Sequence, residues 1–258
     1  ADEQRRFAQW LVEARAAGIS NVLLAFKASR DQPGRLPTRR EYEAGVLKVL
    51  ASVDAKGDRQ MIDSISPWNE PDLSSATTAR PFEAGQLFSV IRRICRERGC
   101  TALAGDFADS RFTAAYLSKY LAGAGAPMPL HWAWHAYDDA WTRRVDPSMP
   151  RLRSFLSLLP ANARVRLSEQ GGILWRPRSR LSGERRISQT PAQAGADLSF
   201  LLNKAATIDP RVNAFDVYQW RGEPPPAWDS GLIAPGGATR PSYCVFAEAL
   251  AVSAPACR

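Results

Sequence analysis

Two glutamates in this sequence end apolar segments, where acidic side chains are unusual. Glu70 lies in SISPWNEPD at 64–72, and Glu169 closes RVRLSE at 164–169. The proline and asparagine beside Glu70 do not suit a strand interior, because proline cannot donate to a ladder and an amide is costly to bury. We therefore expect both glutamates where buried strands end at a cleft. Two carboxyl groups facing each other there, one protonated and one ionised, are what hydrolysis of a glycosidic bond requires.

Short apolar segments that favour strands alternate with segments of helical spacing. The predicted strands span residues 21–26, 61–66, 101–106, 130–137, 164–169 and 214–220. The predicted helices span residues 2–18, 38–53, 81–98, 112–123, 151–159, 190–206 and 240–251. One of these helices opens with Thr38 and Glu41, which form a capping-box pattern. The alternation indicates a parallel sheet with right-handed crossovers.

Long loops rich in proline and glycine follow the predicted strands, and the carboxyl ends of strands are where a β/α barrel builds its active site. Six strands are two fewer than a closed barrel needs, and an open sheet would leave two exposed edges. We expect one catalytic α/β domain over residues 1–258, a (β/α)8 TIM-type barrel that lacks its first two strand–helix units. The charged start at Ala1 carries no signal-peptide pattern and suggests a processed or shortened chain.

The formal net charge is +8, from 34 basic and 26 acidic residues, and only five of the basic residues are lysines. The arginines are scattered over predicted helices, whereas a nucleic-acid binder gathers them on one face. A solvated surface is the favoured interpretation, with no nucleic-acid partner. The dense run from Arg176 to Arg186, including Arg178 and Arg180, allows a second hypothesis, the binding of an acidic sugar. No apolar segment is long enough to span a membrane.

Four cysteines fall as two close pairs, Cys95 with Cys100 and Cys244 with Cys257. An even number at close spacing favours two disulfides and an oxidising compartment, with buried free thiols as the alternative. Neither pair has a histidine near it in sequence. The two histidines, His131 and His135, would lie about 13 Å apart along a strand. We therefore predict no metal ion in catalysis, and no cofactor.

Four short motifs resemble, in order and context, the clan A glycoside hydrolases. They are WNEP at 68–71, HAY at 135–137, LSEQG at 167–171 and YQW at 218–220. The likeness is nearest to family 39 and related secreted bacterial hydrolases, which are retaining (β/α)8 enzymes. It implies Glu70 as acid/base at the end of strand four and Glu169 as nucleophile at the end of strand seven. It further implies a polysaccharide or oligosaccharide substrate and a secreted or cell-surface location. We expect a monomer.

The resemblance also suggests residues that contact the sugar. Asn69 would hydrogen-bond the hydroxyl beside the reacting carbon, and Trp220 would form the floor of the sugar subsite. His135 and Tyr137 are expected on one face of a strand, with Tyr137 near Glu169. Further aromatic contacts are predicted from Trp68 and from two loop residues, Trp175 and Trp228.

One departure leaves an alternative open. Clan A enzymes usually carry an arginine near the end of strand two, and no segment of this chain matches that strand. The alternative is a carbohydrate-binding barrel without catalytic activity. The sequence predicts neither the sugar and its linkage nor endo or exo action, because loops decide these.

Overall fold

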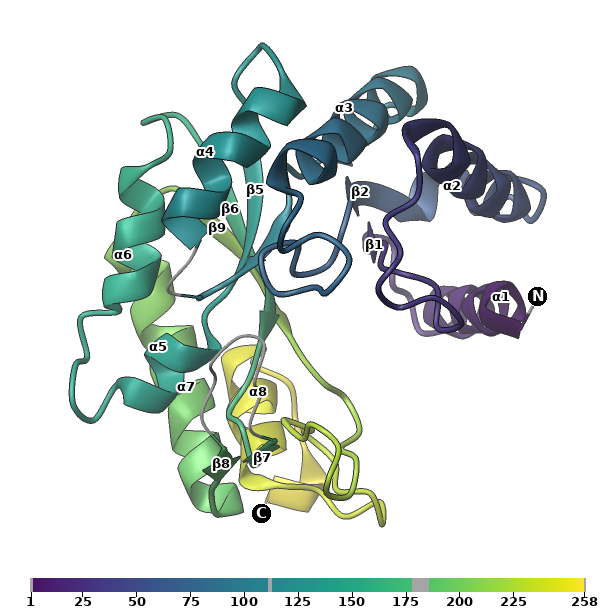
Figure 1. Ribbon diagram of the computed structural model, residues 1–258. Coiled ribbons are helices and arrows are strands. Elements are labelled where there is room, and N and C mark those ends of the chain that lie inside the picture. Colours follow the sequence, from purple (N-terminus) through teal and green to yellow (C-terminus); the bar gives the residue numbers. More distant parts are fainter. Residues whose placement is uncertain (1, 111–112, 178–185, 258) are drawn as a thin grey trace. The chain divides into compact units, whose positions relative to one another are not determined.

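The structure, a computed structural model, describes residues 2–110, 113–177 and 186–257 (Figure 1). The chain divides into two compact units. The first comprises Ala1–Asp106 and Ala115–His131, and the second comprises Phe107–Ala114 and Trp132–Arg258. No helix among the described residues is long and apolar enough to cross a membrane.

The first unit holds a three-stranded parallel sheet with the order β1-β2-β3. Its strands are β1 (Val22–Ala25), β2 (Ile62–Ser66) and β3 (Thr101–Ala102). Its helical elements are α1 (Asp2–Ala16), α2 (Arg39–Asp54), the short η1 (Arg59–Met61) and α3 (Pro81–Arg98), and α4 (Thr113–Ala124) lies mostly in this unit. The sheet registers Leu24 with Ile65, so the carboxyl ends of β1 and β2 lie at the same edge.

Helix α2 shows how the local sequence fixes an element of the first unit. Thr38 Oγ1 accepts a hydrogen bond from the Glu41 backbone N at 3.3 Å, and Glu41 Oε2 accepts one from the Thr38 backbone N at 2.8 Å. The predicted capping box is therefore confirmed. Behind this cap, the apolar face of α2 packs into the core with residues of α3 and β2, namely Tyr42, Val46, Leu50, Val53, Ile65, Leu87, Ile91 and Ile94.

The second unit contains a four-stranded sheet with the order β4-β5-β6-β9, in which β6 and β9 are parallel. Its strands are β4 (Asp106–Ala108), β5 (His131–His135), β6 (Arg164–Gln170) and β9 (Val212–Val217), and β7 (Trp175–Arg176) pairs with β8 (Ile187–Ser188) as an antiparallel ribbon. Its helices are α5 (Tyr137–Thr142), α6 (Pro150–Ser157), α7 (Pro191–Ile208), α8 (Pro241–Ala249) and η2 (Pro255–Cys257).

Aromatic side chains of β5 form much of the core of the second unit. Trp132 and Trp134 are fully buried and both contact Phe155 of α6, the Trp134 ring stacking on it with 4.3 Å between centroids. Phe107 of β4 packs against Trp132 and Phe155. The alternation of strand side chains thus sends both tryptophans toward α6.

The predicted strands and helices are largely confirmed, with three corrections. The strand predicted at 214–220 spans Val212–Val217, so Trp220 lies beyond its end. The segment 101–106 was expected as one strand, but it divides into β3 and the start of β4. Leu103 N donates to Ile65 O and Ala104 N donates to His131 O, so the backbone changes partner between these residues. The strand predicted at 130–137 ends at His135, and Tyr137 opens α5 instead. Closure of the strands into a barrel stays a prediction.

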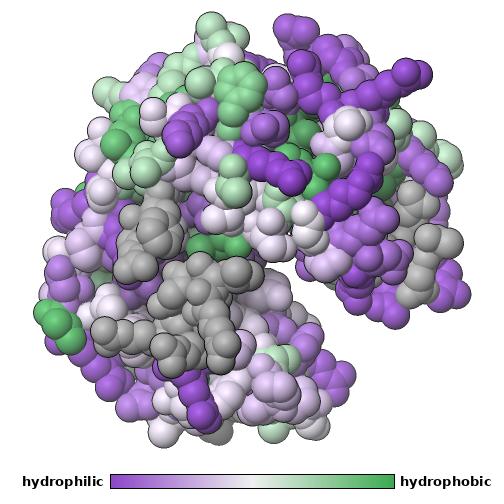
Figure 2. Space-filling model, in the orientation of Figure 1, coloured by the Kyte–Doolittle hydropathy of each residue, from purple (hydrophilic) through white to green (hydrophobic). Residues whose placement is uncertain are grey.

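Both predicted disulfides are present. Cys95 and Cys100 are joined at the end of α3, and Cys244 in α8 is joined to Cys257 in η2. Each disulfide lies within one unit. On the face that Figure 2 presents, hydrophilic side chains are widely spread, with hydrophobic ones in smaller groups between them.

Candidate active site

Glu169 lies near the carboxyl end of β6, and its side chain is 19% exposed. The Tyr137 hydroxyl donates a hydrogen bond to Glu169 Oε1 at 3.2 Å. His135 Nε2, from the end of β5, lies 3.9 Å from the other carboxylate oxygen. A hydroxyl donor favours the ionised form of a carboxylate, which is the form that attacks as a nucleophile.

Gln170 is a site residue that the sequence analysis missed. Its fully buried side chain accepts from Ala136 N at 2.9 Å and donates to Trp134 O at 2.8 Å. These two bonds tie the end of β6 to the end of β5. Gln170 directly follows Glu169, so these bonds also hold the backbone that carries Glu169. A glutamine directly after a glutamate at a strand end was the available signal.

The segment after Glu169 runs too close to its neighbours for side chains. A Cβ atom added at Gly171 would meet Tyr218 O at 2.4 Å, and one at Gly172 would meet Ala194 O at 1.8 Å. Real Cβ atoms do not approach backbone so closely, so both glycines are required here. The LSEQG motif therefore serves close packing around Glu169 as well as chemistry.

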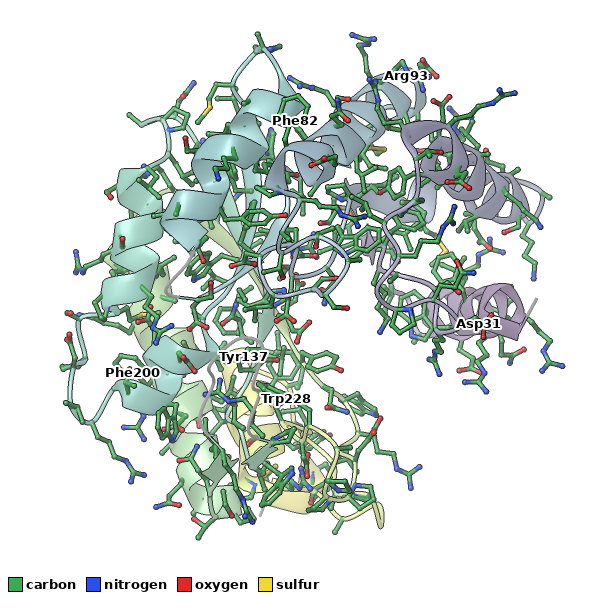
Figure 3. All side chains as sticks on the ribbon, in the orientation of Figure 1. Asp31, Phe82, Arg93, Tyr137, Phe200 and Trp228 are labelled. Carbon is green, nitrogen blue, oxygen red and sulfur yellow. A yellow bond between two sulfur atoms is a disulfide. The ribbon has the colours of Figure 1, made fainter. Side chains whose placement is uncertain are left out.

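An aromatic pair stands beside Glu169. The Tyr137 ring meets the Trp228 ring edge-to-face with 4.8 Å between centroids. Figure 3 labels the two residues. The Trp228 Nε1 donates to Ser230 Oγ at 3.0 Å, and this hydroxyl donates to Tyr218 O at 2.8 Å. The half-buried Trp228 is thus held from the loop that follows β9.

The other predicted aromatic contacts of the second unit differ in exposure. The Trp220 side chain, beyond the end of β9, is 63% exposed, and its ring contacts Tyr243 edge-to-face. Trp175 is half-buried, and the Arg186 guanidinium lies 4.3 Å from the centre of its ring. Trp220 therefore offers an open ring, whereas one face of Trp175 is covered by a cation.

For Arg176 itself, the hypothesis of binding an acidic sugar is wrong. Its side chain is buried, and Nη1 donates to Asp138 Oδ1 at 2.6 Å. Its charge is balanced inside the protein and is not presented to a ligand. Arg178 and Arg180 lie outside the described residues.

Glu70 lies in the first unit, just beyond β2. Its backbone N donates to Asp106 O at 2.8 Å, and the preceding Asn69 N donates to Phe26 O at 2.7 Å. The φ angle of Glu70 is 48°, in the left-handed region, which costs about 1–3 kcal/mol for a residue other than glycine. Such strain is typical of functional sites.

A pocket of about 400 Å³ opens at Asn69 and Glu70 within the first unit. Two cationic side chains, Lys27 and Arg30, and the hydroxyls of Ser29 and Ser74 also line it. No sequence motif pointed to these residues, although the place of Lys27, Ser29 and Arg30 just after β1 was a signal. The pocket offers hydrogen-bond donors and acceptors of the kind that sugar hydroxyls need.

Trp68 is the predicted sugar contact that lies deepest. Its side chain is 2% exposed and belongs to the core of the first unit. It also lines a second pocket, of about 350 Å³, together with Phe26 and Tyr42. Its burial is that of a packing residue rather than an open sugar platform.

By sequence, no protein-family model and no curated protein match this chain. Several solved structures are similar to it in fold. One is a β-1,3-glucanosyltransferase of Rhizomucor miehei, an active-site mutant in complex with laminaritriose. It is 12% identical with a TM-score of 0.63, and the match covers 92% of this chain and 80% of that one.

Two bacterial enzymes give similar matches. A GH39 β-xylosidase from Caulobacter crescentus is 16% identical with a TM-score of 0.56, covering 90% of this chain and 54% of that one. A GH128 endo-β-1,3-glucanase from Amycolatopsis mediterranei, a mutant form in complex with laminarihexaose, is 16% identical with a TM-score of 0.55, covering 81% of this chain and 78% of that one. The chain therefore has an α/β fold similar to that of clan A-like glycosidases, as its motifs predicted.

Proposed function

We propose that this protein is a retaining glycoside hydrolase in which Glu169 is the nucleophile and Glu70 the general acid/base. The observation that carries the proposal is the setting of Glu169. This carboxylate stands at the carboxyl end of a strand, is partly exposed, and accepts a hydrogen bond from the Tyr137 hydroxyl at 3.2 Å. The fold, similar to glycosidase structures, supports the same reading.

The proposed reaction has two steps. Glu169 attacks the anomeric carbon while Glu70 gives its proton to the leaving oxygen, and a glycosyl ester forms on Glu169. Glu70, now ionised, takes a proton from water, and the resulting hydroxide displaces the ester with net retention. This mechanism requires the two carboxyl groups to lie about 5 Å apart in the substrate complex.

Neighbouring residues would hold the sugar. Asn69 precedes the acid/base and borders the same pocket, so it is placed to bond a hydroxyl of the bound ring. The open ring of Trp220 would pack against the C–H face of a sugar. No metal ion or cofactor enters this mechanism.

The substrate that we propose is an extracellular or cell-wall polysaccharide. Two of the similar structures carry laminari-oligosaccharides, and a third is a β-xylosidase. β-Linked glucans and xylans are therefore the first substrates to test. The two disulfides support an oxidising, extracellular setting. The monomeric state stays a prediction.

The test is hydrolysis of laminarin, other β-glucans and xylan by the wild-type chain and by Glu70→Gln and Glu169→Gln. We expect each variant to lose at least about a thousandfold in kcat, since each lacks one of the two carboxyl groups. Glu248→Gln, which changes an exposed glutamate on α8, is the control and should keep full activity.

Proton NMR of the first product formed would report the anomeric configuration. Retention is expected, and an inverted product would rule out the double displacement. Turnover at the wild-type rate by either glutamine variant would reject the role assigned to that glutamate. Binding of a glycan without hydrolysis by any form would favour the carbohydrate-binding alternative.

A further inference from the structure

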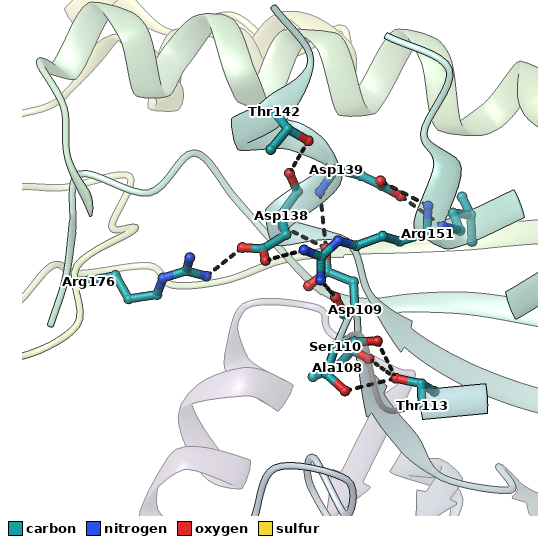
Figure 4. A network of polar contacts seen from close by, with 10 residues as sticks. Ala108, Asp109, Ser110, Thr113, Asp138, Asp139, Thr142, Arg151 and Arg176 are labelled. Atoms are coloured by element: carbon teal, nitrogen blue, oxygen red, sulfur yellow. Dashed lines mark hydrogen bonds and ion pairs between the residues drawn. The ribbon is translucent and has the colours of Figure 1, made fainter. Parts of the chain in front are cut away.

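Asp109 connects two segments of the second unit. It directly follows β4, and its Oδ2 accepts hydrogen bonds from the backbone N of Asp138 at 2.5 Å and of Asp139 at 3.1 Å (Figure 4). These N–H groups belong to the first turn of α5, where a helix has no internal acceptor for them. Asp109 therefore caps α5 from a distant part of the sequence.

Tyr137 is the first residue of α5, immediately before the two capped N–H groups. Its hydroxyl is the donor to Glu169 Oε1. A short helix depends on its cap, because it has few hydrogen bonds of its own. The position of the Tyr137 ring thus depends on the carboxylate of Asp109.

Two arginines hold the side chain of Asp138, the residue after Tyr137, in the same network. Arg151 Nη2 lies 3.1 Å from Asp138 Oδ2, and Arg176 Nη1 donates to Asp138 Oδ1 at 2.6 Å. Arg151 Nη1 also donates to the backbone carbonyl of Asp109. The start of α5 is therefore clamped through its backbone and through the Asp138 side chain.

Asp139 provides an internal comparison. It is also buried, but its carboxylate accepts from Arg151 N at 3.1 Å and from Leu152 N at 2.8 Å. It therefore caps the start of α6 and not of α5. The two aspartates share their surroundings and differ in which helix their side chains hold.

The Asp109 carboxyl is costly to keep ionised. Its burial raises its pKa well above the ordinary value, the nearby Asp138 and Asp139 carboxylates raise this pKa further, and Arg151 acts in the opposite direction. Stability alone does not favour a buried charge over a neutral cap. Residues kept at such a cost are often kept for function.

We propose that Asp109 is a positioning residue for the reaction: by capping α5 it holds the Tyr137 hydroxyl on Glu169. This inference rests on the proposed role of Glu169. It predicts that removal of the acceptor at 109 disturbs Tyr137 even in the absence of a substrate.

The first test is spectroscopic and needs no activity. Protein labelled with ¹³C at the tyrosine Cζ atoms gives one signal per tyrosine, and Tyr137→Phe identifies the signal of Tyr137. We expect that signal to move in Asp109→Ala and in Glu169→Gln. It should stay at its wild-type position in the control Asp146→Ala, at an aspartate whose carboxylate bonds to Ser148 of its own loop. An unmoved Tyr137 signal in a folded Asp109→Ala variant would overturn the inference.

The second test is kinetic. Asp109→Ala should lower kcat on the order of tenfold, because displacement of a group by an ångström is enough for such a loss. In the Tyr137→Phe background the same substitution should cause no further loss, since the hydroxyl it positions is absent. Asp109→Asn, which keeps an acceptor oxygen, should recover most of the activity. An equal loss with and without the tyrosine hydroxyl would contradict the positioning role.

Folding of the variants is checked by circular dichroism. If Asp109→Ala does not fold, Asp109→Ser replaces it, because the shorter hydroxyl reaches less far than the carboxylate. The Tyr137 signal should move in this variant as well, and a wild-type signal would overturn the inference. If the wild-type chain hydrolyses no glycan, the proposed function fails, while the NMR result still decides whether Asp109 positions Tyr137.

Discussion

A buried acid whose pKa is raised makes a pH-dependent contribution to stability, and Asp109 is such a residue. The folded chain binds its proton more tightly than the unfolded chain does. The contribution is therefore complete below the ordinary pKa of 3.8 and is lost as the pH rises through the raised value.

We expect the stability of the wild-type chain relative to Asp109→Asn to fall as the pH rises above about 4. Asparagine has no proton to lose, so it removes the titration of this side chain. Urea unfolding of both proteins between about pH 4 and about pH 8 measures the difference in their unfolding free energies. This range starts near the ordinary pKa of an aspartate and extends upward to include a raised one. A constant difference across that range would contradict the expected titration.

Trp220 is an exposed aromatic residue whose removal should affect binding more than folding. We expect Trp220→Ala to raise KM for an oligosaccharide substrate and to change the free energy of unfolding by no more than about 0.5 kcal/mol, as for other surface residues. Trp10→Ala, at a 45% exposed tryptophan of α1, is the control and should leave KM unchanged. Equal KM values for wild type and Trp220→Ala would remove this ring from the sugar site.

Elements of both units begin with the same local device. Thr38 caps α2 and Thr190 caps α7, each in a capping box with the residue three positions later. We expect Thr38→Ala and Thr190→Ala each to cost about 1 kcal/mol of unfolding free energy. Thr207→Ala is the control, because the exposed Thr207 hydroxyl bonds to a carbonyl within the last turn of α7 and caps no helix start. Chemical denaturation measures the unfolding free energy of the three variants. If Thr38→Ala and Thr190→Ala lose no more of it than Thr207→Ala does, the capping role is refuted.

Local patterns predicted these elements well, and long-range contacts explain the exceptions. Helix α5 starts at Tyr137, and the carboxylate that caps it belongs to Asp109, twenty-nine positions before Asp138. No local sequence pattern reveals this contact. The partner change at Leu103 and Ala104 likewise follows from strands far apart in sequence.

The same limit applies to the candidate site. Glu70 and Glu169 were predictable because acidic residues at strand ends are unusual. Arg176 was misjudged because its partner, Asp138, comes from another segment. Gln170 was overlooked because its polar bonds to β5 are invisible in sequence.

At the scale of the whole molecule, most of the described arginines are exposed, but several are used in ion pairs within the protein. Arg98 makes two bonds of 2.7 Å to Asp54, and Arg240 pairs with Asp229 through both of its terminal nitrogens. The planar guanidinium suits such two-point contacts, which a lysine cannot reproduce. The positive charge of the chain is therefore a poor guide to its ligands.

The two disulfides should stabilise the chain unequally. Their cysteines are 5 and 13 positions apart, and loop-entropy estimates give about 2 and about 3 kcal/mol. One double variant, Cys244→Ser with Cys257→Ser, removes the longer loop closure, and the other, Cys95→Ser with Cys100→Ser, removes the shorter one. We expect the first variant to lose more unfolding free energy than the second. A reducing agent should lower the Tm of the wild-type chain and leave a variant without any cysteine unaffected. The reverse order of the two losses would contradict the entropy argument.

The scarcity of lysine has a practical consequence for the pocket at Glu70. Lys27 lines that pocket and is exposed, and the chain has only four other lysines. An amine-selective acylating reagent followed by mass spectrometry would therefore report on this one wall with little background. A bound glycan should shield Lys27 from the reagent and leave Lys48, exposed on α2, as reactive as before. This scarce residue is thus a built-in reporter of pocket occupancy.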